Sequence, residues 1–240
     1  MKKIDNEVIK FLSDAVHTAD SVNIPNIVID EDGLRGLDPN DKLVVILKPV
    51  IDIDLPFESL ALGDVSRFLQ RLNIHNSNNG SEILIDKNDN GGVKSLKFKS
   101  KNLSIDYRCV KSSLFNKIIP KRVNDQSIGV IELNDDVIDM LKKGFATMKC
   151  ETVLFYKPKD TDEIQFIMKD DTKSEFTYDI ELPFKQDDPS DEITFANNYP
   201  IKTIMAALKD SDTMEIVIGE NGSLTIKKNR IDIIIPRRLV

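Results

Sequence analysis

One pattern occurs four times along this chain, and it constrains the fold more than any other feature of the sequence. Each copy has an amphipathic helix of about three turns, with apolar residues at i, i+3 or i+4 and i+7, followed by three short segments of strand character. The second copy opens at Phe57. The predicted helices cover residues 4–19, 62–74, 135–148 and 200–209. The predicted strands cover residues 26–30, 43–47, 50–55, 82–86, 95–100, 103–110, 128–133, 151–156, 164–169, 175–182, 192–195, 214–218, 223–227 and 230–235.

Local signals place the ends of these elements and define the fold class. Asn134, followed by two aspartates, predicts a helix N-cap with an acidic first turn that complements the helix dipole. Asn221-Gly222 predicts a two-residue hairpin turn. Because strands joined by hairpins form antiparallel sheets, the helices must cover one face of each sheet. The sequence therefore predicts an α+β fold with antiparallel sheets outside and helices on one face. We expect two similar domains of two βαβββ units each, residues 1–115 and 128–240, joined by a polar, basic connector at 116–127.

Composition limits the partners and the compartment. The 240 residues include 33 Lys and Arg against 40 Asp and Glu, a formal net charge of -7. The averaged surface therefore repels nucleic acid and anionic membranes, and any DNA contact must lie in a local patch. Two cysteines are too few for a disulfide framework, the N-terminus lacks the apolar core of a signal peptide, and no stretch approaches the roughly 18 apolar residues of a membrane span. We expect an intracellular protein with no membrane partner.

The predicted helices carry rows of cationic side chains on the face away from the sheets. Spacings of four and seven residues stack these groups along one side of a helix. This arrangement suggests a surface that holds phosphates by Coulomb attraction without reading bases. An alternative stays open, because lysines on a solvated helix face commonly serve solubility and because Asp14, Asp64 and Asp139 lie on the same helices. The candidate DNA-binding residues are Lys3, Lys10, His17, Arg67, Arg71, Lys142, Lys143, Lys149, Lys202 and Lys209.

No arrangement of residues predicts catalysis, a metal or a cofactor. The pair Asp52 and Asp54 is typical of an exposed strand face, and the acids at 160–163 belong in a hairpin turn. The acids at 187–191 lack the glycine and the spacing of a calcium loop. The chain also has no phosphate-cradling Gly-Lys-Ser/Thr motif, and we expect Cys109 and Cys150 to be buried small hydrophobes. We therefore expect a protein that is not an enzyme.

Two segments resemble a known family. Residues 31–45, EDGLRGLDPNDKLVV, are similar to the first-domain segment of sliding clamps of the proliferating cell nuclear antigen type, where a Glu-Asp-Gly-Leu turn leads to a Met-Asp-Pro-Ser-Arg-Val-like loop. Leu37 stands in the place of that methionine. The tail at 230–240, with three isoleucines before Pro236, resembles the last strand and close of that family. The first copy begins almost directly with its helix, so its N-terminal strand is absent or very short. In this the chain resembles clamps of tailed phages, and we expect a viral origin.

The resemblance implies a DNA polymerase processivity factor of DNA clamp fold. Such a clamp is a homotrimeric ring around double-stranded DNA, with helices lining the hole, an acidic exterior and no catalytic residues. A clamp loader places it at replication forks, in the cytoplasm or nucleoid of a host that a virus has infected. The subunit interface, an antiparallel pairing of edge strands, would comprise Leu103, Ile105, Tyr107, Cys109, Phe176, Tyr178, Ile180 and Leu182. The polymerase would bind a pocket of Leu37, Leu43, Ile118, Ile119, Pro236 and Leu239.

Other hypotheses stay open at this stage. One is a monomeric clamp-like processivity factor that holds DNA by charge alone, and its mass in solution would separate it from a ring. Another is a viral structural or adaptor protein on a two-domain β scaffold, whose lysines serve only solubility. A metal-dependent nuclease is a more distant hypothesis, because no acidic cluster converges in the sequence.

Overall fold

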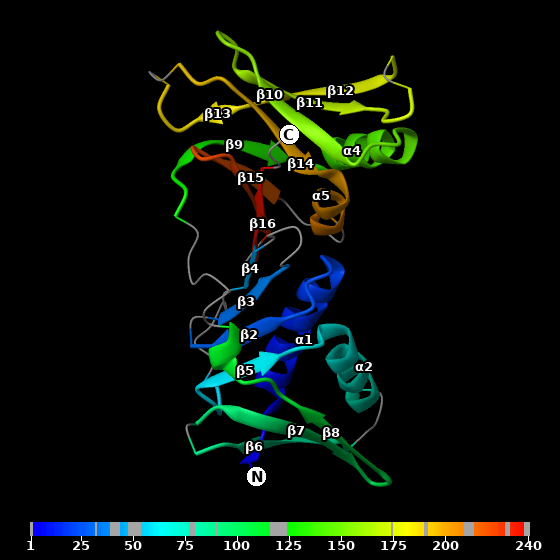
Figure 1. Ribbon diagram of the computed structural model, residues 1–240, viewed down its shortest axis with the longest axis vertical. Coiled ribbons are helices and arrows are strands. Elements are labelled where there is room, and N and C mark those ends of the chain that lie inside the picture. The colour runs from blue at the N-terminus through cyan, green and yellow to red at the C-terminus, as the bar shows by residue number, and fades with distance from the viewer. Residues whose placement is uncertain are drawn as a thin grey trace. The chain divides into compact units, whose positions relative to one another are not determined.

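The chain folds into two compact units, Met1–Arg122 and Val123–Val240 (Figure 1). The structure is a computed structural model. It describes residues 2–31, 33–38, 44–47, 54–76, 80–89, 91–115, 124–173, 175–189, 192–208, 214–228 and 231–237. No helix among these residues is long and apolar enough to cross a membrane.

Unit 1 contains two four-stranded antiparallel groups, β5-β2-β3-β4 and β1-β6-β7-β8. Its first half is made of β1 (Lys2–Lys3), α1 (Asn6–Ser21), β2 (Ile27–Asp30), β3 (Gly33–Leu37) and β4 (Val44–Leu47). Its second half is made of β5 (Ser59–Leu62), α2 (Val65–Asn76), β6 (Glu82–Lys87), β7 (Val93–Ser100), β8 (Leu103–Arg108) and the short α3 (Ser112–Phe115). The N-terminal strand is indeed very short, because β1 has two residues, which pair with Ile85 and Leu84 of β6.

Unit 2 repeats this plan with the strand orders β13-β9-β15-β16-β17 and β12-β11-β10-β14, again antiparallel throughout. Its first half is made of β9 (Ser127–Leu133), α4 (Asp135–Thr147), β10 (Thr152–Lys157), β11 (Glu163–Lys169), β12 (Thr177–Pro183) and β13 (Lys185–Gln186). Its second half is made of β14 (Phe195–Pro200), α5 (Ile201–Ala207), β15 (Met214–Gly219), β16 (Ser223–Lys228) and β17 (Ile231–Pro236).

In each unit the helices gather on one side of the strands. Figure 1 shows α1 beside α2 in unit 1 and α4 beside α5 in unit 2, and each pair is in contact. Each helix buries an apolar stripe, exemplified by Phe11 and Leu12 of α1 and Phe68 of α2, all at most 3% exposed. Full burial of one such side chain stabilises the fold by about 1.5–3 kcal/mol. The predicted α+β arrangement, antiparallel sheets with helices on one face, is confirmed.

The N-terminal ends of α1, α2 and α4 are capped by side chains, and the cap of α2 is Asp64, whose Oδ1 accepts a hydrogen bond from the Arg67 N–H at 2.9 Å. Asn134 caps α4 as predicted, because its Oδ1 accepts a hydrogen bond from the Val137 N–H at 2.9 Å. Asp5 caps α1 in the same way, with its Oδ1 2.9 Å from the Val8 nitrogen. The first helix therefore begins at Asn6, two residues later than predicted, and Ile4 is buried beside β6 instead.

Several predicted boundaries are wrong, and each has a local cause. β3 was missed because two glycines interrupt its strand pattern, and β14 begins at Phe195 rather than at Glu192. The second helix begins at Val65, because β5 extends through Leu62. The fourth helix ends at Ala207, with Pro200 at its N-cap. Residues 54 and 55 of the predicted strand at 50–55 are not in a strand, and the rest of that prediction lies outside the described residues.

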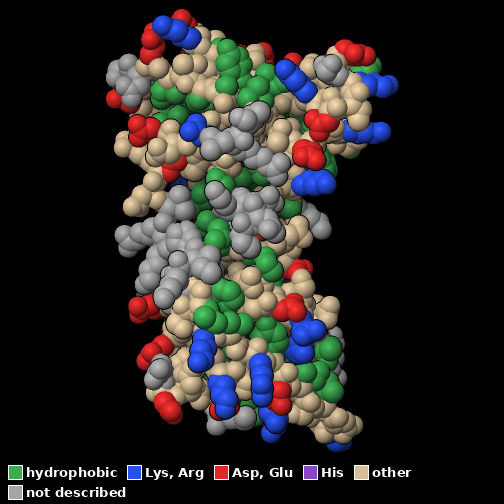
Figure 2. Space-filling view, viewed as in Figure 1, with side chains coloured by type: hydrophobic (Ala, Val, Ile, Leu, Met, Phe, Trp, Pro, Cys, Tyr) green, Lys and Arg blue, Asp and Glu red, His purple; other side chains and the backbone are tan. Residues whose placement is uncertain are grey.

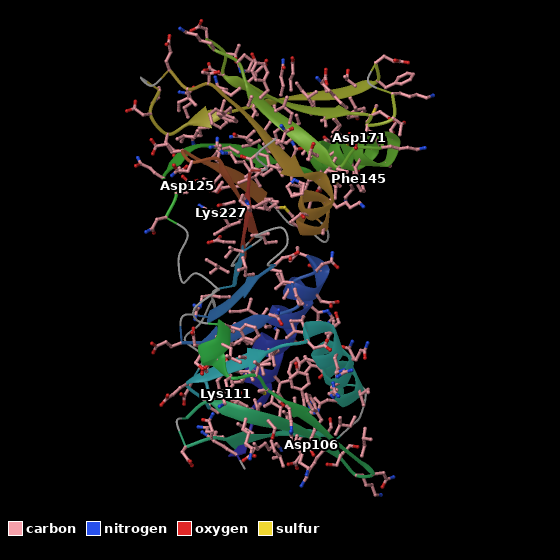
Figure 3. The ribbon with its side chains drawn as sticks, in the orientation of Figure 1. Asp106, Lys111, Asp125, Phe145, Asp171 and Lys227 are labelled. Atoms are coloured by element: carbon pink, nitrogen blue, oxygen red, sulfur yellow. The ribbon has the colours of Figure 1, made fainter. Side chains whose placement is uncertain are left out.

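Asp125 fastens the start of unit 2 to the β15–β16 turn (labelled in Figure 3). Its carboxylate accepts hydrogen bonds from the Asn221 N–H at 2.8 Å, from Asn221 Nδ2 at 3.1 Å and from the Ser223 N–H at 3.0 Å. Gly222 adopts a φ of 82°, which glycine tolerates without steric cost. Burial raises the pKa of Asp125, but the hydrogen bonds from Ser223 and Asn221 outweigh it and hold the pKa below its ordinary value.

We expect Asp125→Ala to lower the free energy of unfolding by about 1–3 kcal/mol at neutral pH, because it leaves three donors without their acceptor. The folded-state pKa is below the unfolded value. The carboxylate therefore stabilises the fold above the unfolded-state pKa, and this contribution is lost as the pH falls through the folded-state pKa. Denaturant unfolding should show the full difference at about pH 7 and a difference that shrinks as the pH falls below about 4, the ordinary pKa of an aspartate. A difference that does not depend on pH would contradict this assignment; Asp89→Ala, at an exposed turn, is the control.

Candidate nucleic-acid interface

The cationic side chains of unit 1 lie on the exposed faces of α1 and α2. Lys10 and His17 are exposed on α1, with Asp14 between them on the same face. Arg67 is exposed on α2, and its Nε is 3.5 Å from the Asp64 carboxylate. Because both partners of this pair are at least 49% exposed, solvent screens it and the guanidinium can exchange Asp64 for a phosphate at little cost.

Arg71 differs from its neighbours, because it packs back onto the sheet. Its guanidinium carbon lies 5.3 Å from the centroid of the Tyr107 ring, and Nη1 donates to the Arg67 carbonyl at 3.2 Å. The Tyr107 hydroxyl in turn donates to the Asp64 carbonyl at 3.2 Å, and burial raises the pKa of this tyrosine. Arg71 therefore covers the junction of α2 and β8 and is less free to reach a ligand than Arg67 is.

Unit 2 presents its cations on α4, α5 and the residues after α4. Lys142 and Lys143 are exposed in the second half of α4, and the Lys142 Nζ is 3.8 Å from Asp139 Oδ1. Lys149 is exposed just beyond the end of α4, and Lys202 is exposed on α5. The structure therefore brings exposed cations to the helix side of both units, together with acids at the helix N-termini such as Asp135, where they complement the dipole.

Lys3 and Lys149 were both predicted on the helices and lie off them; Lys149 follows α4, which ends at Thr147. Lys3 was assigned to the first helix, but it lies in β1 and pairs with Leu84 of β6. The assignment was wrong because the Asp5 cap starts α1 after it. Lys209 lies outside the described residues.

Among the described strands, β8 in unit 1 and β12 in unit 2 are open sheet edges. β8 ends the order β1-β6-β7-β8, and β12 ends the order β12-β11-β10-β14. The Cys109 N–H donates to the Lys94 carbonyl at 3.0 Å, and the Asp170 N–H donates to the Phe176 carbonyl at 3.1 Å. Hydrogen-bonded and non-hydrogen-bonded pairs alternate along an antiparallel ladder. Every second N–H of an edge strand therefore points outward, away from the neighbouring strand and in the plane of the sheet. These outward positions are Ser104, Asp106 and Arg108 on β8 and Thr177, Asp179 and Glu181 on β12.

The side chains of the implied subunit interface lie on the helix side of these edges. Tyr107, Ile180 and Leu182 are at most 5% exposed, so they belong to the cores of their own units. Leu103 and Phe176 are 40% and 51% exposed and are available for contact. Ile105, Tyr178 and Cys109 are half-buried. The two edges thus offer less exposed side-chain surface for contact than the resemblance implies. A contact between subunits would therefore depend more on the unpaired backbone N–H and C=O groups of β8 and β12.

Leu37 lies in a small apolar cluster of unit 1. It packs with Val110 and Phe115 against the buried side chains of Val28 and Ala61. Phe115 ends the short helix α3, which lies just before the connector and contacts β2 and β5. Leu114, in the same helix, is 59% exposed. Of the other pocket residues, Pro236 is half-buried at the end of β17 in unit 2, and Leu43, Ile118, Ile119 and Leu239 lie outside the described residues.

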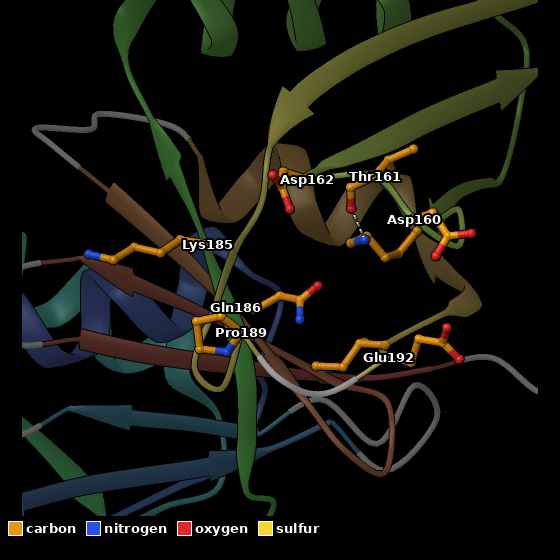
Figure 4. Close-up of a pocket in the computed structure, with 9 residues that line it drawn as sticks. Asp160, Thr161, Asp162, Lys185, Gln186, Pro189 and Glu192 are labelled. Carbon is orange, nitrogen blue, oxygen red and sulfur yellow. Dashed lines mark hydrogen bonds between the residues drawn. The ribbon is translucent and has the colours of Figure 1, made fainter.

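Unit 2 also has a polar hollow of ≈ 400 Å³ (Figure 4), which offers no catalytic arrangement. The buried Lys157 ammonium donates to the carbonyls of Pro158 and Thr161, so it closes the β10–β11 turn. The acids Asp160 and Asp162 lie in this turn, as the sequence predicts. Within the described ranges, no three His, Cys, Asp or Glu side chains gather in a group that could hold a metal ion. Burial raises the pKa of Cys109 to about 12, so its thiol is protonated and a poor nucleophile at neutral pH.

Comparisons with known proteins identify the fold. Solved structures match over nearly the whole chain. A PCNA2–PCNA3 complex from Sulfolobus tokodaii matches at 14% identity and a TM-score of 0.62, covering 96% of both chains. The proliferating cellular nuclear antigen of Entamoeba histolytica matches at 11% identity and 0.62, again over 96% of both chains. The Helicobacter pylori beta clamp bound to a DNA ligase peptide matches at 11% identity and 0.66, covering 95% of this chain and 64% of that one. No protein-family model and no curated protein sequence matches the chain. The structural matches show that the chain has the DNA clamp fold, as the sequence predicts.

Proposed function

We propose that the protein is a sliding clamp, a homotrimeric ring that encircles duplex DNA and holds a DNA polymerase at the replication fork. The observation that carries the proposal is the clamp fold itself, which extends over 96% of the chain in the matches to the Sulfolobus and Entamoeba structures. The Helicobacter clamp was solved with a DNA ligase peptide, which supports the expectation that clients bind this fold through short peptides.

The mechanism is topological rather than chemical. A closed ring cannot leave circular DNA without opening, whereas weak contacts to phosphates allow it to slide. The exposed cations Lys10, Arg67, Lys142, Lys143 and Lys202 suit this task. Their flexible charges attract the backbone without directional contacts to base edges. Acids on the same helices limit the strength of each contact, so no single position traps the ring.

Ring closure would use the two open edges. Pairing β8 of one copy with β12 of the next satisfies the outward N–H groups of both strands and removes an exposed edge, which is otherwise a liability for aggregation. Such a head-to-tail contact generates a ring when its rotation closes. Two units in each copy favour three copies.

Retention on DNA circles tests this function without a loader. Dilute, dissociated subunits are concentrated in the presence of nicked circular DNA and passed through a sizing column at about 0.5 M salt, where simple charge contacts are screened. We expect the protein to stay with circular DNA and to be released when a restriction enzyme linearises the circle. Sedimentation of the free protein should give the mass of three chains. Binding to linear and circular DNA with equal salt sensitivity would instead indicate a monomeric processivity factor.

The client pocket is tested with the apolar residues beside the connector. We expect Leu37→Ser with Leu114→Ser to reduce stimulation of the polymerase at least about tenfold, because truncating an anchor in such a groove costs about 2 kcal/mol or more. The oligomer should remain intact, since neither residue lies at an open edge. Primer extension on a long template measures the effect. Tyr156→Ser, at another exposed apolar residue, in unit 2, is the matched control, and equal effects of the two changes would contradict the assignment.

A further inference from the structure

The charge of the chain is distributed unevenly between the two units. Unit 1 contains 18 Lys and Arg against 17 Asp and Glu, whereas unit 2 contains 15 against 23. The net charge of -7 therefore comes from unit 2.

The difference in charge between the units is largest in the two four-stranded sheets that end in β8 and β12. Residues 82–111, which form β6, β7 and β8, contain seven Lys and Arg and four acids. Figure 2 shows such cationic side chains gathered over β6 and β7. Residues 152–200, which contain the corresponding sheet of unit 2 together with β13, include five Lys and twelve acids. One of those five is Lys157, whose buried ammonium is held by carbonyls.

At the edges themselves the two signs separate further. The segment 99–111 carries four exposed cations, and its one acid, Asp106, lies 3.8 Å from the Lys97 ammonium. The segment 175–183 carries three exposed acids and no Lys or Arg. Figure 3 labels Asp106 and Lys111 on the unit 1 side. The cations are Lys99, Lys101, Arg108 and Lys111, and the acids are Glu175, Asp179 and Glu181.

We infer that these edges recognise each other by charge, so that the cationic β8 edge of one copy selects the acidic β12 edge of a second copy of this chain. The inference rests on the proposed ring and names what directs its assembly. Opposite potentials steer the approach of two surfaces and disfavour wrong partners. A β8–β8 contact would bring eight cations together, and a β12–β12 contact six acids. Both symmetric dimers are therefore disfavoured. The remaining contact is the head-to-tail pairing of β8 with β12, which builds a ring.

Charge reversal at each edge tests the inference by sedimentation of the full chain. Reversal of the β8 side uses Lys99→Glu, Lys101→Glu and Arg108→Glu, and reversal of the β12 side uses Glu175→Lys, Asp179→Lys and Glu181→Lys. We expect each triple variant to raise the Kd of self-association about a hundredfold, and about 0.5 M salt to raise that of the wild type about tenfold. An equimolar mixture of the two variants should associate again, because the β8 edge of each variant meets an opposite charge on the β12 edge of the other. A closed ring of three would need one contact between two copies of the same variant, so the mixture should form open mixed oligomers.

Controls separate the possible failures. Lys2→Glu, Lys3→Glu and Lys87→Glu make the same change of net charge away from the β8 edge and should leave the Kd within about threefold. An equal effect of this control, or a mixture of triple variants that stays dissociated, would overturn the inference. If salt does not change the Kd of the wild type and neither reversal changes the Kd, the inference about charge is also overturned. The proposed ring would not be affected by that result. A wild type that is monomeric at about 100 µM would instead refute the proposed ring.

Discussion

Asp106→Pro and Asp179→Pro are each expected to turn the assembled protein into a folded monomer. Both residues hold outward N–H groups on open edges, Asp106 on β8 and Asp179 on β12. A proline there deletes the donor that a neighbouring copy would use and leaves the hydrogen bonds within the sheet in place. Because pairing is cooperative along the strand, the loss should raise the Kd of association by about a hundredfold or more.

The chain itself indicates that such a proline is tolerated. Pro183 already occupies an outward position at the end of β12. By contrast, Tyr107→Pro would remove a donor that faces β7 and disturb a ring packed on Phe68, with centroids 5.1 Å apart, so it would unfold unit 1 rather than test the edge.

Sedimentation at several concentrations measures the effect, with circular dichroism to verify the fold. Asp106→Ala and Asp179→Ala are the matched controls, because they remove the same carboxylates and keep the N–H groups. The alanine variants should assemble nearly as the wild type does. Proline variants that keep the mass of the oligomer would show that these edges do not join the subunits.

The sequence predicted the elements whose signals are local. The Asn134 cap is where the pattern put it, and a hairpin turn is present at Asn221-Gly222, because each depends on contacts between residues a few positions apart. The turn has three residues, 220–222, rather than the predicted two, because the Gly222 N–H donates to the Gly219 carbonyl and only Gly222 has a positive φ.

β3 was missed because Gly33 and Gly36 interrupt its strand pattern. Arg35, in its centre, is 1% exposed and pairs with Asp30 of β2, an environment that a glycine-rich segment does not reveal.

In the candidate site, too, the sequence predicted the features that depend on local spacing and missed those that depend on packing between distant elements. Helical spacing was sufficient to place Lys10, Arg67 and Lys142 on exposed faces. It could not show that Arg71 is held over the Tyr107 ring, because these residues meet only when α2 packs on β8. The opposite charges of the two edges were present in the sequence, but the net charge of the whole chain concealed them until the sheets were defined.

Reversing one cation on each of α1, α2, α4 and α5 should stop loading onto DNA while the subunits still fold and assemble. The variant combines Lys10→Glu, Arg67→Glu, Lys142→Glu and Lys202→Glu, all at exposed positions. If these helices line the hole, each group meets phosphates only transiently. A single Lys→Ala change should then weaken binding slightly and equally for every DNA sequence, lowering the salt slope by at most about one unit. The quadruple reversal replaces attraction by repulsion on all four helices at once, so redundancy no longer hides the loss.

Retention on nicked circular DNA and the salt dependence of binding measure the effect. The matched control reverses four lysines of strands, Lys87, Lys169, Lys185 and Lys227, which are all exposed and change the net charge by the same amount. We expect the control to retain at least about half of the wild-type binding, because its charges lie away from the helix faces and are screened within about 10 Å at 0.1 M salt. If the control loses DNA as completely as the helix variant does, net charge alone governs binding. The helices would then not face the duplex, and the proposed sliding mechanism would lose its physical basis even though the clamp fold remains.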